Sequence, residues 1–165
     1  MDDAAALAPM TTEMYHAYYK EYQNDPDLYL DKSQCSPFTY SPEWVDGYIQ
    51  RQVRRNRKCF AIMVGAEMAG EVIIKNIEPG KCATLGICMK NDQYKNRGIG
   101  TQAERLAIDY VFRELDIPVL YADTILTNER SQRVLEKVGF RYLRTEGDFK
   151  YYQIHRDHKN DWSAE

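Results

Sequence analysis

The chain has 165 residues, a net charge of −3 and 44% hydrophobic residues. This length is enough for one domain with a buried core, and the composition is that of a globular rather than a disordered chain. The charge gives no reason to expect a nucleic-acid partner, no apolar run approaches the length of a membrane span, and the first residues lack a secretory signal.

The N-terminal part of the chain predicts a strand followed by a helix. Ala5 to Met10 has the pattern of a short strand, which Pro9 confines to the edge of a sheet because proline cannot donate a ladder hydrogen bond. Thr11 and Thr12 are candidate caps for a helix that runs to about Tyr22.

A loop from Asn24 to Tyr40 separates this helix from a second one. Ser41-Pro42-Glu43 combines a capping hydroxyl, a first-turn proline and an acid near the positive end of a helix. The helical period predicts that five side chains face inward, namely Trp44, Val45, Tyr48, Ile49 and Val53.

Three strands then follow as an antiparallel meander. The expected strands cover Cys59–Val64, Glu71–Ile77 and Cys82–Lys90, with turns at Gly65–Gly70 and Glu78–Lys81. Gly86 is a possible β-bulge in the third strand.

The C-terminal half predicts a helix, a strand, a second helix and a hairpin. The elements expected are a helix over Gly98–Leu115, a strand over Val119–Thr127, a helix capped by Asn128 and terminated by Gly139, and strands over Tyr142–Thr145 and Phe149–His155. The first helix has Ala103, Leu106, Ala107, Tyr110 and Val111 at core spacing. Residues from about 157 to 165 read as a polar tail.

The most informative motif is the glycine loop that opens the first of these helices. Gly98 and Gly100 let the backbone turn tightly and approach a ligand without an intervening Cβ. The unpaired amides at the helix start add a partial positive charge, so the loop is suited to a phosphate or pyrophosphate. Together with Ala103 and Asp123, the glycines also fit the fingerprint of a dinucleotide-binding fold, but the hairpin strands before them do not suit that fold.

The order of elements and two sequence signatures resemble the GNAT superfamily of N-acetyltransferases. Lys95-Asn96-Arg97-Gly98-Ile99-Gly100 matches the family's pyrophosphate loop, with Lys95 in place of Gln or Arg. Asn128-x-x-Ser131-x-x-Val134-Leu135-Glu136-Lys137-x-Gly139-Phe140 is similar to the branch that includes the ribosomal-protein N-terminal acetyltransferases. The resemblance implies an α+β fold, one mixed, mainly antiparallel sheet flanked by helices, formed by residues 1–165 as a single domain.

The resemblance also implies where acetyl-CoA binds. It would lie between the strand ending at Lys90 and the strand ending at Thr127, where exposed strand amides can pair with the pantetheine arm. The implied cofactor-binding residues are Ile87, Cys88, Met89, Lys95, Asn96, Arg97, Gly98, Ile99, Gly100, Thr101, Asn128 and Ser131.

The implied reaction is attack by a neutral amine on a thioester. Many members of the family use a Tyr as the acid for the departing thiolate, at the position of Leu135, whereas in the branch resembled here a Ser has this role, at the position of Ser131. A helical Ser can equally bond only to backbone. No general base is evident. Glu71, Asp123, Tyr152 and His155 lie on expected strands, and Asp123 is the first candidate because it borders the expected cleft.

The function predicted from these features is transfer of an acetyl group from acetyl-CoA to a primary amine, in a ternary complex and without a metal. The acceptor can be a protein N-terminus, a polyamine or a small amine. The alternatives are a non-catalytic acyl-CoA sensor and a nucleotide-binding oxidoreductase. We expect a monomer or homodimer with no nucleic-acid or membrane partner.

Two charged segments and the cysteines leave further alternatives open. Asp25, Asp27 and Asp31 can attract a cationic acceptor or be solvated, and the basic residues from Arg51 to Lys58 can be a solvated helix end or a nucleic-acid patch. The four cysteines form no CxxC pair and no ligand pattern with the three histidines, which predicts a reducing, cytoplasmic compartment.

Overall fold

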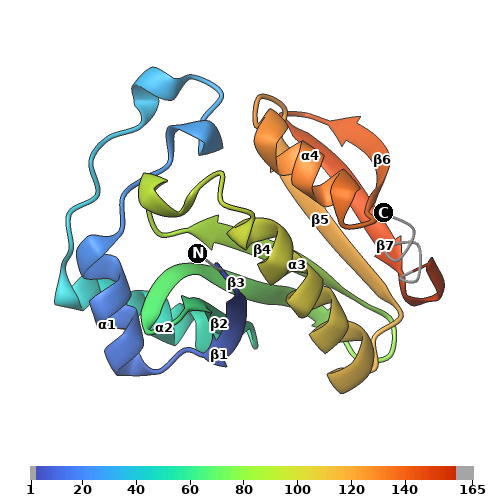
Figure 1. Cartoon of the computed structure of the whole chain (residues 1–165), viewed down its shortest axis with the longest axis horizontal. Coiled ribbons are helices and arrows are strands. Elements are labelled where there is room, and N and C mark those ends of the chain that lie inside the picture. Colours follow the sequence, from blue (N-terminus) through green and yellow to red (C-terminus); the bar gives the residue numbers. More distant parts are fainter. Residues whose placement is uncertain (1–2, 159–165) are drawn as a thin grey trace.

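One mixed sheet organises the chain, and the computed structural model describes residues 3–158 of it. The strands lie in the order β1-β2-β3-β4-β5-β7-β6 (Figure 1). Their bounds are β1 Ala5–Pro9, β2 Lys58–Val64, β3 Glu67–Glu78, β4 Cys82–Met89, β5 Val119–Ile125, β6 Arg141–Glu146 and β7 Phe149–His155. Among the strands of residues 3–158, only β4 and β5 pair in parallel. This confirms the predicted α+β class and leaves no doubly wound parallel sheet for a dinucleotide-binding fold.

Helices cover both faces of the sheet. The α-helices are α1 Thr12–Glu21, α2 Pro42–Arg54, α3 Ile99–Asp109 and α4 Glu129–Lys137, with short 3₁₀ turns η1 Pro26–Leu28, η2 Lys32–Gln34 and η3 Asp92–Tyr94. The larger apolar core lies between the sheet and α3 and α4, and includes Val72, Leu85 and Leu120. A smaller, mainly aromatic core joins α1 and α2 to the other face.

Local capping fixes the helix starts where the sequence predicts them. The side chains of Thr11, Ser41 and Asn128 each accept a hydrogen bond from the amide three residues on, which opens α1, α2 and α4. Gly139, with φ of 109°, follows the last turn of α4. The local caps therefore define the residues at which these three helices begin.

The end of α3 differs from the regular helix that the sequence predicts. Residues Tyr110–Glu114 form a π-helix, η4, in which the amide of Leu115 donates to the carbonyl of Tyr110. The wider turn buries Val111 and Phe112 together, whereas Leu106, predicted to be in the core, is 38% exposed.

The turn between β2 and β3 is shorter than predicted. It consists of Gly65 and Ala66 alone, since Val64 pairs with Glu67. Gly70 lies within β3 rather than in the turn. The strand needs a glycine at this position, because a Cβ would lie 2.6 Å from the carbonyl oxygen of Cys88. The proposed bulge at Gly86 is also wrong: Gly86 pairs regularly with Ile73, and the irregularity of that hairpin lies between Lys75 and Glu78.

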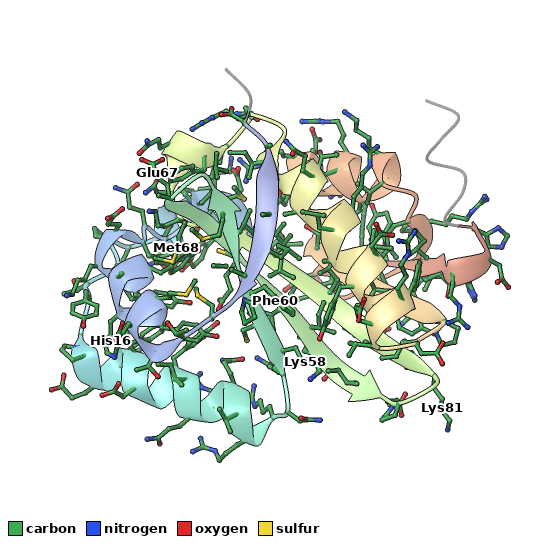
Figure 2. All side chains as sticks on the ribbon, turned by 60° about the horizontal axis from the view of Figure 1, so that its bottom comes forward. His16, Lys58, Phe60, Glu67, Met68 and Lys81 are labelled. Atoms are coloured by element: carbon green, nitrogen blue, oxygen red, sulfur yellow. The ribbon has the colours of Figure 1, made fainter. Side chains whose placement is uncertain are left out.

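The inward face of α2 is only partly as predicted. Val45 is fully buried, but Trp44 is 42% and Val53 72% exposed. Gln52 is buried instead, and its side-chain oxygen accepts a hydrogen bond from Arg57 at 3.0 Å. Figure 2 shows His16 on α1 facing α2, where its ring bonds to Tyr40 and to Asp46 of α2.

Replacing Gly70 should destabilise the fold at the edge of the cleft described below. The Cβ of Gly70→Ala would meet backbone on β4, which cannot move without disturbing the strand pair. We expect a loss of about 1–3 kcal/mol in the free energy of unfolding, measured by denaturant titration. Gly86→Ala on β4 is the control, because its Cβ would meet its nearest atom at an ordinary 3.8 Å. Equal costs for the two variants would contradict this explanation.

Candidate functional site

A cleft opens where β4 and β5 stop pairing. Their parallel register runs from Cys82 opposite Val119 to Leu85 opposite Ala122, and then the strands diverge (Figure 1). A cavity of about 560 Å³ fills the gap. Residues Gly86–Met89 line it on one side, so the backbone groups on the free edge of β4 are available to a ligand.

The N-terminus of α3 forms an anion-binding end of this cleft. Gly98 adopts the left-handed conformation, with φ of 75°, and no side chain caps the helix. A Cβ at Gly98 or Gly100 would meet no atom within 4 Å, so the space in front of both glycines is open. The amides of Ile99, Gly100 and Thr101 precede that of Gln102, which is the first to donate within the helix, to the carbonyl of Gly98, so these three amides can donate to a phosphate. These residues therefore fit the diphosphate of a CoA molecule.

Cations along one face of α4 add positive charge to the same cleft. Arg130, Arg133 and Lys137 line it. The sequence interpretation did not single them out, although their spacing of three and four residues after the Asn128 cap places them on one helical face. Their charges increase the attraction of the cleft for an anionic ligand.

Two cations expected to bind the ligand are instead paired with carboxylates. Lys95 Nζ lies 2.8 Å from Asp25 and 2.6 Å from Asp92, and burial alone would lower the pKa of Lys95 but these carboxylates raise it. Arg97 bonds bidentately to Asp3, at 2.9 and 2.8 Å. A phosphate would have to compete with these carboxylates for either side chain.

In the acidic loop, Asp25 and Asp27 are paired with cations, whereas Asp31 is exposed and its carboxylate accepts hydrogen bonds from Ser33. Asp25 is only 7% exposed, and it bonds to Lys95 and, at 3.2 Å, to Arg130. Burial alone would raise the pKa of Asp25, but hydrogen bonds from Lys95 and the amide of Asp27 and the nearby cations hold it below its usual value. Asp27 pairs with Lys32 and Arg130. Figure 1 shows this loop reaching toward the start of α4.

The structure brings most of the expected ligand-binding residues to one cleft. The residues that line it are Ile87, Cys88, Met89, Lys95, Asn96, Gly98, Gly100, Thr101, Asp123, Asn128 and Ser131. Arg97 and Ile99 are not among its lining residues: Arg97 is turned to Asp3, and Ile99 is fully buried in the core. Asn128 uses its side-chain oxygen to cap α4 through the amide of Ser131.

Ser131 and Asp123 approach the cleft from opposite sides of the sheet. Ser131 is in the first turn of α4, and Leu135, where the family's Tyr would stand, is buried one turn later. Asp123 alternates with Ala122 and Thr124, which are buried toward the helices, so it is exposed on the other face of β5. The cleft thus passes through the sheet from the side of α3 and α4 to the opposite side.

A buried acid that the sequence did not predict lies in this cleft. Glu104 of α3 is 2% exposed and lines the cavity together with the apolar Leu85, Ala122 and Leu135. Its Oε2 atom has no hydrogen-bond partner within residues 3–158. Burial raises the pKa of Glu104 to about 8, so the carboxyl is largely protonated at neutral pH.

The sequence that forms this cleft and sheet matches a known protein family. The profile of the acetyltransferase (GNAT) domain matches residues 6–141. The chain belongs to the GNAT acetyltransferase family. A Bacillus subtilis protein, "Probable N-acetyltransferase YjcK", is 34% identical over 96 residues, which are 56% of this chain and 53% of the relative. The chain thus spans about half the length of this curated GNAT relative.

Two solved structures share the fold. Spermidine N-acetyltransferase from Vibrio cholerae, in complex with CoA and spermine, is 15% identical with a TM-score of 0.77, over 96% of this chain and 99% of that one. RimL, a ribosomal L7/L12 alpha-N-protein acetyltransferase in complex with CoA, is 20% identical with a TM-score of 0.73, over 95% and 97%.

Two further observations concern residues 3–158. No helix in this range is long and apolar enough to cross a membrane. Within the same range, His, Cys, Asp and Glu side chains form no group of three or more that could hold a metal ion. The C-terminal part of the predicted polar tail, residues 159–165, lies outside the described residues.

The burial of Glu104 should make stability depend on pH. Its folded pKa lies above the unfolded value of 4.5, so ionisation opposes folding: stability is highest below pH 4.5 and is lost as pH rises toward about 8. Glu104→Gln removes this titration and should raise the free energy of unfolding at pH 8 by on the order of a few kcal/mol, with little change at pH 5. Denaturant titrations at both pH values measure the difference. Glu114→Gln, at an exposed position, is the control, and a Glu104→Gln variant that keeps the wild-type pH slope would show that Glu104 is not its source.

Proposed function

We propose that this GNAT family member transfers an acetyl group from acetyl-CoA to a primary amine in a ternary complex. The observation that supports this most is the cleft between β4 and β5, which combines a free strand edge with the uncapped N-terminus of α3. The first feature suits an amide-containing arm and the second a diphosphate, and CoA has both in one molecule.

Binding of CoA would reorganise the charges at the mouth of the cleft. The amides of Gly98–Thr101 would hold the diphosphate, and Lys95 and Arg130 would exchange part of their contact with Asp25 for phosphate oxygens. The amides of Ile87, Cys88 and Met89 would pair with the pantetheine arm, and Asn128 would border it. Amides near Cys88 would also stabilise the thioester oxygen as it becomes negative.

Ser131 and Asp123 are the catalytic candidates from the sequence. Ser131 would relay a proton to the departing thiolate, because Leu135 has no hydroxyl to do so. Asp123, on the opposite side of the sheet, is the sequence candidate for the group that accepts the proton of the acceptor ammonium, and a second candidate for this role is argued in the next subsection. The acceptor remains one of three classes: a polyamine, a protein N-terminus or a small amine. The structural neighbours named for spermidine and for a ribosomal protein make spermidine and a free-N-terminus peptide suitable first probes.

A non-catalytic acyl-CoA sensor is the second candidate, and the buried Leu135 in place of the family's Tyr favours it. Release of free thiol from acetyl-CoA, followed at steady state with spermidine, a free-N-terminus peptide and a small primary amine, separates the two functions. A sensor would bind CoA and release no thiol with any of them.

Filling the space in front of the glycine loop should abolish CoA binding. Gly100→Val places a branched side chain where the phosphates must approach, and we expect CoA affinity to fall by several kcal/mol, measured by calorimetry. Gly47→Val in α2 is a matched control, because that glycine is also in a helix with no atom near its Cβ position. If folded Gly100→Val bound CoA as tightly as the control, the assignment of the diphosphate site would be wrong.

Ser131→Ala tests proton delivery to the thiolate. We expect kcat to fall by roughly ten- to a thousand-fold, with a smaller change in KM for acetyl-CoA, because the hydroxyl acts on the departing group rather than on binding. Ser36→Ala, in the exposed loop, controls for loss of a hydroxyl elsewhere. An unchanged kcat would leave Ser131 as a packing residue of α4.

A further inference from the structure

A buried carboxyl, that of Glu71, lies next to Cys88 on the face of the sheet that α1 and α2 cover. Glu71 is on β3, directly opposite Cys88 on β4, and side chains of such a pair lie on the same face. Cys88 lines the cleft, whereas Glu71 is 2% exposed beneath α1 and α2. Glu71 is therefore one strand away from the position at which the thioester would lie in the proposed function.

Three tyrosines surround this carboxyl. The hydroxyl of Tyr48, on α2, donates to Oε1 at 2.7 Å, and that of Tyr19, on α1, donates to the same atom at 3.4 Å. Tyr15 is the third tyrosine beside the carboxyl, and it lowers the pKa of Glu71. The second oxygen, Oε2, has no partner within residues 3–158 although it is buried. A buried carboxyl with one oxygen held and the other unpaired is costly, and such groups concentrate at functional sites.

The same cluster reaches the cleft through Cys88. Tyr18 donates to the carbonyl oxygen of Cys88 at 3.4 Å, and the hydroxyl of Tyr22 lies 3.8 Å from its sulfur. Both tyrosines are in ring contact with Tyr19. One group of hydroxyls thus connects the Glu71 carboxyl with the strand edge that would hold the reacting thioester.

From this geometry we infer that Glu71 is the group that accepts the proton of the acceptor ammonium. The inference rests on the proposed acetyl transfer. Glu71 does not itself line the cleft, so the proton passes from the ammonium to its carboxyl through water or the intervening hydroxyls, and the neutral amine attacks the thioester carbon. The C–N bond forms, the C–S bond breaks, the attacking nitrogen loses its second proton, and the departing thiolate gains one through Ser131. The nitrogen thus loses two protons, of which one is taken up by the thiolate and the other is held by Glu71, so the step balances with no further reactant.

The charges around Glu71 suit a base that works near neutral pH. Burial raises the pKa of Glu71 to about 7, and hydrogen bonds from the tyrosines limit the rise. The titratable groups that face it are Tyr15, Tyr18 and Tyr19 of α1, Tyr48 of α2, Cys59 of β2 and Cys88 of β4. Burial raises the pKa of all six, so Glu71 is the member of the cluster that can exchange a proton at physiological pH.

The first test is the pH profile of kcat/KM, with acetyl-CoA and whichever probe amine gives the fastest thiol release. For the wild type we expect kcat/KM to rise with pH and to level off above about pH 7, because Glu71 must lose its proton to act as a base; this rise is called the acid limb. Glu71→Gln should lower kcat/KM by 10²- to 10⁴-fold and remove this limb. Glu78→Gln, the same change at an exposed position of β3, is the matched control. Calorimetric CoA affinity should be the same in both variants.

The Tyr48→Phe variant distinguishes proton acceptance from a purely structural role of Glu71, because only the first predicts a shift in the pH of the acid limb. It removes the 2.7 Å hydrogen bond that favours the carboxylate, so the pKa rises and the acid limb should shift to higher pH, with activity recovering above it. Tyr40→Phe removes a hydroxyl of the same region that does not contact Glu71 and should leave the limb in place.

The outcomes separate this inference from the proposed function. If the wild type released no thiol with any amine, the proposed function would be wrong, and the role of Glu71 with it. If the wild type were active while Glu71→Gln kept both the acid limb and kcat/KM, only the role of Glu71 would be overturned. Loss of the limb in Asp123→Asn with its retention in Glu71→Gln would assign proton acceptance to Asp123. A Glu71 carboxyl found by ¹³C NMR titration to be ionised throughout the range above pH 5 would also overturn the inference.

Discussion

The site depends on one constraint, the end of hydrogen bonding between β4 and β5 after Leu85 and Ala122. These two strands form the only parallel pair of the described sheet, and beyond that point β4 continues to pair with β3 on its other edge, as far as Met89. The free edge of β4 therefore faces a gap rather than solvent at the margin of the sheet. Both α3 and α4 begin at this gap, so their positive N-terminal ends lie beside unpaired strand groups.

Ion pairs of one carboxylate span the mouth of the cleft. Asp25 bonds to Lys95 at a separation of 70 residues in sequence and to Arg130 at a separation of 105. Because these two cations belong to the glycine loop and to α4, one buried carboxylate joins both sides of the mouth of the cleft. Phosphates offer stronger and more numerous acceptors than one carboxylate. Ligand binding and release of the acidic loop are thus expected to be linked, since both use the same two cations.

The sequence predicted those features whose causes are local. Caps at Thr11, Ser41 and Asn128 and the glycine loop depend on residues within one helical turn, and the structure has them where the patterns indicate. The short turn before β3 was missed because the placement of Gly70 depends on the carbonyl of Cys88, a tertiary contact. The pairing of Lys95 with Asp25 was missed for the same reason. A charge pattern shows which residues can pair, but only the fold brings together partners so distant in sequence.

Two buried carboxyls show why composition could not identify the chemistry of the site. Glu71 and Glu104 are both nearly inaccessible, and burial raises the pKa of each. Their surroundings differ: tyrosine hydroxyls stabilise the charged form of Glu71, whereas Glu104 lines the cavity among apolar side chains. Glu71 is consequently closer to its ionised form at neutral pH than Glu104. The two acids lie on opposite sides of the sheet, so the carboxyl closer to its ionised form and the carboxyl held neutral are separated by the strands that form the cleft. If Glu71 takes the ammonium proton, as inferred above, it does so on the face opposite Ser131 and the start of α4, so the two proton transfers of the reaction use different groups on different sides of the sheet.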